Sequence, residues 1–140
     1  MALQSGYMAR HKQETPTAVE LEILQVLWDR GPSTVRDVVD ELSKQRKRAY
    51  TSILSMMGVM LNKRLVKRTA QGRAHLYEAR HPREQTLGGM VRDMLGRAFE
   101  GSASSLITHV LAQSNPSDAE LAQIQQAIER YIEEGESTDG

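Results

Sequence analysis

Apolar residues recur at the spacing of helical turns in three successive stretches near the start of the chain. The first stretch covers residues 17–30 and opens with Thr17 and Glu20, which have the spacing of a capping box. The second begins near residue 34 and covers residues 34–42, and the third runs over about residues 50–63. This pattern predicts three amphipathic helices, the last two joined by a polar, basic connection.

The apolar pattern changes after the third helix. Residues 65–69 and 73–79 are short segments of the kind that suits a half-buried sheet. Residues 70–72 lie between them, and Gly72 supplies the positive φ that a turn can require. Three helices followed by a hairpin is the order of a winged helix-turn-helix, which we therefore predict over residues 15–82.

The rest of the chain carries three further amphipathic helices. They are indicated by apolar positions in residues 83–99, around residues 106–111, and after a Ser117–Glu120 capping pattern. About 55 residues make too small an independent core, and pairing with the same segment of a second chain would double the buried surface. We therefore predict a helical dimerisation domain over residues 83–133, with these candidate dimerisation residues: Leu87, Met90, Val91, Met94, Leu95, Phe99, Leu106, Ile107, Val110, Leu121, Ile124 and Ile128.

These elements together predict a mainly α fold with a small β-hairpin, in which an N-terminal winged helix-turn-helix precedes a C-terminal helical dimerisation region. Residues 1–14 are predicted to be a flexible N-terminus, with residues 1–7 as a candidate expression remnant. Residues 134–140 are polar and are predicted to be a disordered tail. The single tryptophan, Trp28, is predicted to pack in the core.

The charge distribution suggests what each half contacts, because the overall balance of zero conceals two opposite halves. Residues 1–83 contain 15 Lys and Arg against 8 Asp and Glu, a net charge of +7, whereas residues 84–140 contain 3 against 10, a net charge of −7. The basic half suits a polyanion, and the acidic half suits protein contact or solvent. The chain has no cysteine and no apolar run near the roughly 20 residues of a membrane span, so we predict a cytoplasmic protein without membrane insertion.

A helix-turn-helix beside basic segments indicates binding to double-stranded DNA. The helix over residues 50–63 would enter the major groove, and basic side chains before it and in the hairpin would contact phosphates or the minor groove. The candidate base-contacting residues are Thr51, Ser52, Ser55 and Asn62. The candidate backbone and wing residues are Arg46, Lys47, Arg48, Lys67, Arg68 and Arg73.

The sequence contains no pattern typical of a catalytic or metal site. The four histidines, His11, His75, His81 and His109, lack the spacing of metal ligands, and no cysteine supports them. No nucleophile elbow and no Gly-rich phosphate loop is present in the sequence. We therefore predict a protein that is not an enzyme and that uses no cofactor or metal.

Six short motifs, in order across residues 17 to about 132, carry a resemblance to a known family. They are ELEILQVLW (20–28), TVRDVVDEL (34–42), AYTSILSMM (49–57), LNKRLV (61–66), GRAHLY (72–77) and FEGS (99–102). The chain resembles the penicillinase-repressor family of bacterial winged-helix transcriptional regulators (BlaI/MecI/CopY type). The resemblance implies a homodimeric repressor of a palindromic operator, in which Thr51, Ser52 and Ser55 face the groove and Arg73 lies at the wing tip.

Three features differ from the pattern of that family. Leu54 and Val59 fill positions that are often basic in the recognition helix, which predicts readout through thymine methyl groups, hydroxyls and DNA shape. The absence of cysteine excludes the copper control of the copper-responsive members. The β-lactam-responsive members are cut by a membrane sensor protease between Asn and Phe. The corresponding pair here is Ala98-Phe99, which keeps the Phe and not the Asn. The prediction of a regulatory cleavage position, and of a membrane sensor protease as a partner, therefore depends on Phe99 alone.

Two other functions stay open on the sequence. The first is a winged-helix protein-interaction module without DNA binding, which predicts no salt-sensitive retention on duplex DNA. The second is a one-component regulator that senses a small molecule, which requires a ligand that shifts operator affinity. No convergent set of polar residues in the sequence indicates a pocket for such a ligand.

Overall fold

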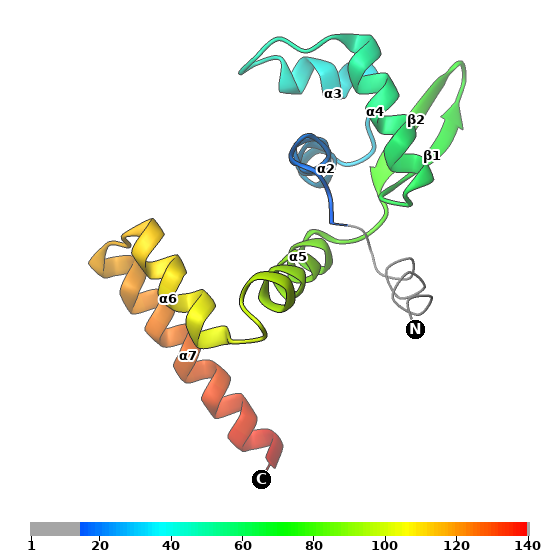
Figure 1. Ribbon diagram of the computed structural model, residues 1–140. Coiled ribbons are helices and arrows are strands. Elements are labelled where there is room, and N and C mark those ends of the chain that lie inside the picture. The colour runs from blue at the N-terminus through cyan, green and yellow to red at the C-terminus, as the bar shows by residue number, and fades with distance from the viewer. Residues whose placement is uncertain (1–14, 140) are drawn as a thin grey trace, which may run out of the picture. The chain divides into compact units, whose positions relative to one another are not determined.

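A computed structural model describes residues 15–139 of the chain (Figure 1). The chain divides into two compact units, the first ending at Asp93 and the second beginning at Met94. The flexible N-terminus and the expression remnant that we predict for residues 1–14 lie outside the described residues. Within residues 15–139, no helix combines the length and the apolar composition that a membrane crossing needs.

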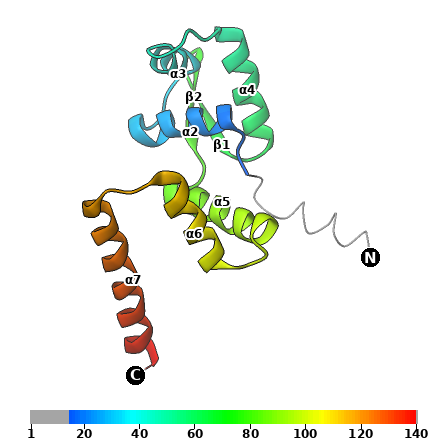
Figure 2. The same cartoon turned by 60° about the vertical axis from the view of Figure 1, so that its left-hand side comes forward.

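The first unit contains three helices followed by an antiparallel hairpin. The elements are α2 (Ala18–Arg30), α3 (Val35–Leu42), α4 (Tyr50–Asn62), β1 (Val66–Gln71) and β2 (Ala74–Ala79). The hairpin lies beside α4 in both views (Figures 1 and 2). The predicted mainly α fold, with a winged helix-turn-helix followed by further helices, is confirmed.

The core of the first unit lies where the three helices meet the hairpin. Ile23, Val38 and Met57 have no exposed surface, and Tyr77 of β2 is 3% exposed. The backbone amide of Ser33 donates to the carbonyl of Tyr77 at 3.0 Å, and the amide of Tyr77 donates back at 2.8 Å. This bridge fixes the returning strand to the connection between α2 and α3, so the hairpin is held in place by the helices.

Two capping boxes begin α2 and α3. The predicted box of Thr17 and Glu20 is present at the start of α2. A second box that the sequence analysis did not identify joins Thr34 to Asp37, whose amide donates to the Thr34 hydroxyl at 3.1 Å. The backbone amide of Thr34 holds the pKa of Asp37 below its usual value, against the opposing effect of desolvation. The charged carboxylate therefore lies at the N-terminus of α3, where the helix dipole favours it.

The hairpin turns through Gly72 and Arg73, whereas the predicted turn covered residues 70–72. Strand β1 continues through Gln71, which pairs with Ala74. Gly72 has a φ of 62°, which glycine adopts without the steric cost that other residues meet. The tight turn places Arg73 at the tip of the wing.

Trp28 packs against the core of the first unit and remains partly exposed, which confirms its predicted packing role. Its Nε1 donates a hydrogen bond to the carbonyl oxygen of His81 at 3.0 Å. The bond satisfies the one polar group of the indole ring. It also ties the segment after β2 to α2.

Three helices follow the hairpin: α5 (Arg83–Ala98), which continues from the first unit into the second, α6 (Ala103–Ser114) and α7 (Asp118–Asp139). Figure 2 shows α7 as a long helix that follows α6 in the chain. None of the described side chains of these helices is buried. One chain, over its described residues, therefore leaves their apolar faces partly exposed.

Helix α7 continues to Asp139, whereas the sequence analysis predicted a disordered tail from residue 134. Glutamates occupy positions 133, 134 and 136, and glutamate is a good helix former. A polar composition by itself therefore does not end a helix. The start of α7 follows its predicted pattern, because the amide of Glu120 donates to the hydroxyl of Ser117 at 3.2 Å.

Candidate nucleic-acid interface

Helix α4 presents an uncharged polar face on the side away from the core. Its buried residues are Ile53, Met57 and Met60. The four candidate base-contacting residues all lie on the exposed side: Thr51, Ser52, Ser55 and Asn62. No residue of α4 is charged. The helix therefore offers hydroxyl and amide groups that can bond to base edges, while neighbouring elements supply the cations for phosphates.

The start of α4 has a cation that the sequence analysis missed. The guanidinium of Arg36, on α3, lies 4.7 Å from the centre of the Tyr50 ring, and both residues are exposed. The N-cap residue, Ala49, makes no side-chain hydrogen bond to the first turn of α4. The first amides of α4 and the Arg36 guanidinium thus form a positive region. In the sequence, Arg36 looks like any polar residue on the solvent side of α3.

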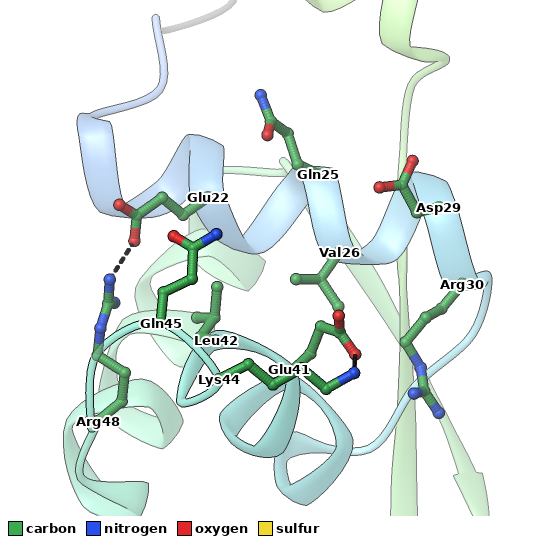
Figure 3. Close-up of a pocket in the computed structure, with 10 residues that line it drawn as sticks. All are labelled: Glu22, Gln25, Val26, Asp29, Arg30, Glu41, Leu42, Lys44, Gln45 and Arg48. Atoms are coloured by element: carbon green, nitrogen blue, oxygen red, sulfur yellow. Dashed lines mark hydrogen bonds and ion pairs between the residues drawn. The ribbon is translucent and has the colours of Figure 1, made fainter.

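The three predicted phosphate-contacting residues in the connection between α3 and α4 have two different environments. Arg46 and Lys47 are exposed, as phosphate contacts would need to be. The Arg48 side chain is only 14% exposed, and its Nη2 lies 2.6 Å from Oε1 of Glu22 on α2 (Figure 3). We therefore correct the predicted role of Arg48: its charge is used to fix the connection onto α2, and it is not offered to phosphate.

A polar groove lies between α2 and the connection (Figure 3). Glu22, Gln25 and Asp29 of α2 border it on one side, and Lys44 and Gln45 lie across from them. Lys44 pairs with Glu41 at 3.2 Å. Acidic and basic groups thus alternate around the groove, which has no single charge with which to attract a polyanion.

The three predicted wing residues all lie on the hairpin, and their surroundings differ. Lys67 lies opposite Glu78, and their charged groups are 3.5 Å apart. Arg68 and Arg73 are both exposed, and Arg73 is part of the turn. Arg73 is therefore the wing residue best placed to reach a phosphate or the minor groove beyond α4.

A buried ion pair, which the sequence analysis also missed, supports the far end of α4. Nζ of Lys63 lies 2.9 Å from both carboxylate oxygens of Glu20 on α2. Glu20 is 1% exposed, and the Lys63 side chain is 21% exposed. The pair joins the first turn of α2 to the C-terminal end of α4. It therefore fixes the direction of the proposed recognition helix relative to the rest of the first unit.

The candidate cleavage position lies at the end of α5. Ala98 is the last residue of that helix, and Phe99 is partly buried with its ring 5.1 Å from the ring of His109.

Among the described residues, no group of three or more His, Asp or Glu side chains could hold a metal ion. The residues that remain predicted DNA contacts are Thr51, Ser52, Ser55, Asn62, Arg46, Lys47, Lys67, Arg68 and Arg73.

Comparison with known proteins agrees with this architecture. A family model described as penicillinase repressor matches residues 16–130. The chain is 30% identical over 124 residues to the transcriptional regulator BlaI of Mycobacterium tuberculosis, covering 87% of this chain and 86% of that protein. It is 22% identical over 112 residues to the penicillinase repressor of Bacillus licheniformis, covering 80% of this chain and 88% of that protein.

One solved structure is also similar to part of the chain. It is the solution structure of monomeric BlaI from Bacillus licheniformis in complex with the blaP half-operator. The match has a TM-score of 0.46 at 23% identity, and it covers 52% of this chain and 89% of that one.

Proposed function

The chain belongs to the penicillinase repressor family, and on this premise we propose that it is a homodimeric transcriptional repressor that binds a palindromic operator. In this proposal α4 of each copy enters a major groove, with Thr51, Ser52, Ser55 and Asn62 at the base edges. Arg36, Arg46, Lys47 and Arg73 contact the flanking phosphates or minor groove. The protein acts in the cytoplasm and is not an enzyme.

The proposal rests on one observation: uncharged polar groups lie on α4, and the cations lie on the elements around it. The helix offers polar groups without charge, and the exposed cations stand on α3, the connection and the wing. The net charge of +7 over residues 1–83 would attract the phosphates of a duplex. A solvated helix without a ligand would more often carry Glu and Lys on such a face.

Dimerisation is proposed for the helices after the hairpin. Val91 and Met94 of α5 are 53% and 51% exposed, and Ile107 and Val110 of α6 are 46% and 48% exposed. Exposed apolar side chains on helices that bury none of their own residues indicate a surface for contact with another protein. A two-fold dimer would cover it and would present two winged helices to a two-fold symmetric operator.

The proposal is tested by selecting genomic DNA fragments that the purified protein retains. We expect a palindrome whose half-sites are separated by about 10 base pairs or a multiple of that, the length of one helical turn. Retention should fall steeply as salt rises, because each neutralised phosphate releases counterions. A protein that stays monomeric and ignores all duplexes at low ionic strength would refute the proposal and favour an interaction module.

Replacing Arg73 by alanine is expected to weaken binding to the operator and to random duplex equally. The loss of one phosphate contact should reduce the slope of log K against log salt by about 1. Ser55→Ala is the matched change on α4. It should instead reduce the preference for operator over random DNA and leave the salt slope unchanged. Fluorescence anisotropy at several salt concentrations measures both, and equal losses on the two DNAs for Ser55→Ala would contradict its assignment to base contacts.

A further inference from the structure

Two positions on α4 are not explained by packing within the protein. Leu54 is 42% exposed although it is a large apolar residue. Gly58 lies four residues later in the interior of the helix, where helical geometry places it next to position 54. A Cβ atom added to Gly58 would meet nothing within 4 Å, and its backbone does not have the positive φ that favours glycine.

Both positions carry a cost in the free protein. Glycine in a helix interior is less stable than alanine, and an exposed leucine leaves apolar surface in water. Neither a close neighbour nor the backbone conformation requires glycine at position 58. A bound ligand that needs close approach to the helix backbone and an apolar surface would account for both.

The chemical character of the surface formed by Leu54 and Gly58 indicates which ligand it can bind. Because α4 has no charged residue, the surface of Leu54 and Gly58 carries no charge of its own for a phosphate, and the Arg36 guanidinium lies over Tyr50, one turn toward the start of the helix. On the base edges of the major groove, the C5-methyl group of thymine is the apolar group. We infer that Leu54 and Gly58 form the contact site for a thymine methyl in each operator half-site. This inference rests on the proposed function.

The neighbours of Gly58 fit a site on base edges. Ser55 and Asn62 adjoin position 58 on the helix, and both are exposed. Their hydroxyl and amide groups lie beside the apolar site and can bond to polar atoms of the same or the adjacent base pair. A methyl contact beside hydrogen bonds distinguishes thymine from cytosine, which has no methyl group at that position.

The test replaces each thymine of the selected operator by deoxyuridine, which removes the methyl group and keeps base pairing. We expect one thymine in each half-site at which the change weakens binding by about fourfold, the effect of burying one methyl group. With Leu54→Ala, binding should no longer distinguish thymine from uracil at that position. Leu76→Ala is the control, because Leu76 is a partly exposed leucine on β2, outside α4, and it should keep the full effect.

Gly58→Ala supplies a second readout. The added methyl should raise the Tm by about 4 °C because alanine is the better helix residue, and it should weaken operator binding because it fills the site. A structural role for Gly58 predicts a lower Tm instead. If the protein selects an operator but no uracil substitution weakens binding, or Leu54→Ala keeps the methyl effect, this inference fails while the repressor proposal stands. If no duplex is retained, the repressor proposal itself fails.

Discussion

Ile107→Asp is expected to convert the protein from a dimer to a monomer and to weaken binding to the full operator by about a hundredfold or more. Ile107 lies on the apolar face of α6 and is 46% exposed in one chain. In a dimer that covers this face, aspartate would place a carboxylate in an apolar contact, at a cost of several kcal/mol. Loss of the second winged helix then removes the gain from binding two half-sites together.

The measurement combines sedimentation with binding to whole and half operators. Affinity for an isolated half-site should be unchanged, because the first unit is untouched. Ala112→Asp is the matched control, since Ala112 is exposed on the opposite face of α6 and should tolerate the charge. The proposed dimer surface would be wrong if Ile107→Asp remained dimeric with full operator affinity.

Glu20→Gln is expected to reduce the free energy of unfolding by about 3 kcal/mol, which corresponds to a fall in Tm of about 12 °C. The substitution keeps the shape and the oxygen that caps α2, where the amide of Thr17 donates to Oε1 at 2.9 Å. It removes the negative charge that faces Lys63 in a site where Glu20 is 1% exposed. The Lys63 ammonium group, whose side chain is 21% exposed, then loses the charge of Glu20 in a partly buried site, which is costly.

Urea unfolding of all variants at the same protein concentration measures this effect, because dimer formation then contributes equally to each of them. Glu78→Gln is the control, because the Lys67 and Glu78 side chains are 56% and 38% exposed and their pair should contribute about 1 kcal/mol or less. The double variant Glu20→Gln, Lys63→Met should recover most of the lost stability, because it replaces both charges by groups of similar shape. Equal losses of unfolding free energy for the two glutamate substitutions would show that the buried pair stabilises the protein no more than the exposed pair does.

The sequence by itself determined the secondary structure, the winged-helix order and the exposed polar face of α4. These features depend on local periodicity, on caps such as Thr17 with Glu20, and on glycine at the turn, all of which act between residues a few positions apart. The exposed positions of Ser55 and Asn62 followed from the same helical period. The end of α7 was misplaced, because a polar sequence can be a helix as well as a tail.

Only the tertiary structure decided which charges are free for DNA. Arg48 looked equivalent to its neighbours Arg46 and Lys47 until folding brought Glu22, 26 residues away, to within 2.6 Å. Glu20 looked like a capping residue alone, yet it also meets Lys63, 43 residues away. Charge pairs depend on distance in space, and the short-range patterns of a sequence do not contain distances between elements that are brought together only when the core packs.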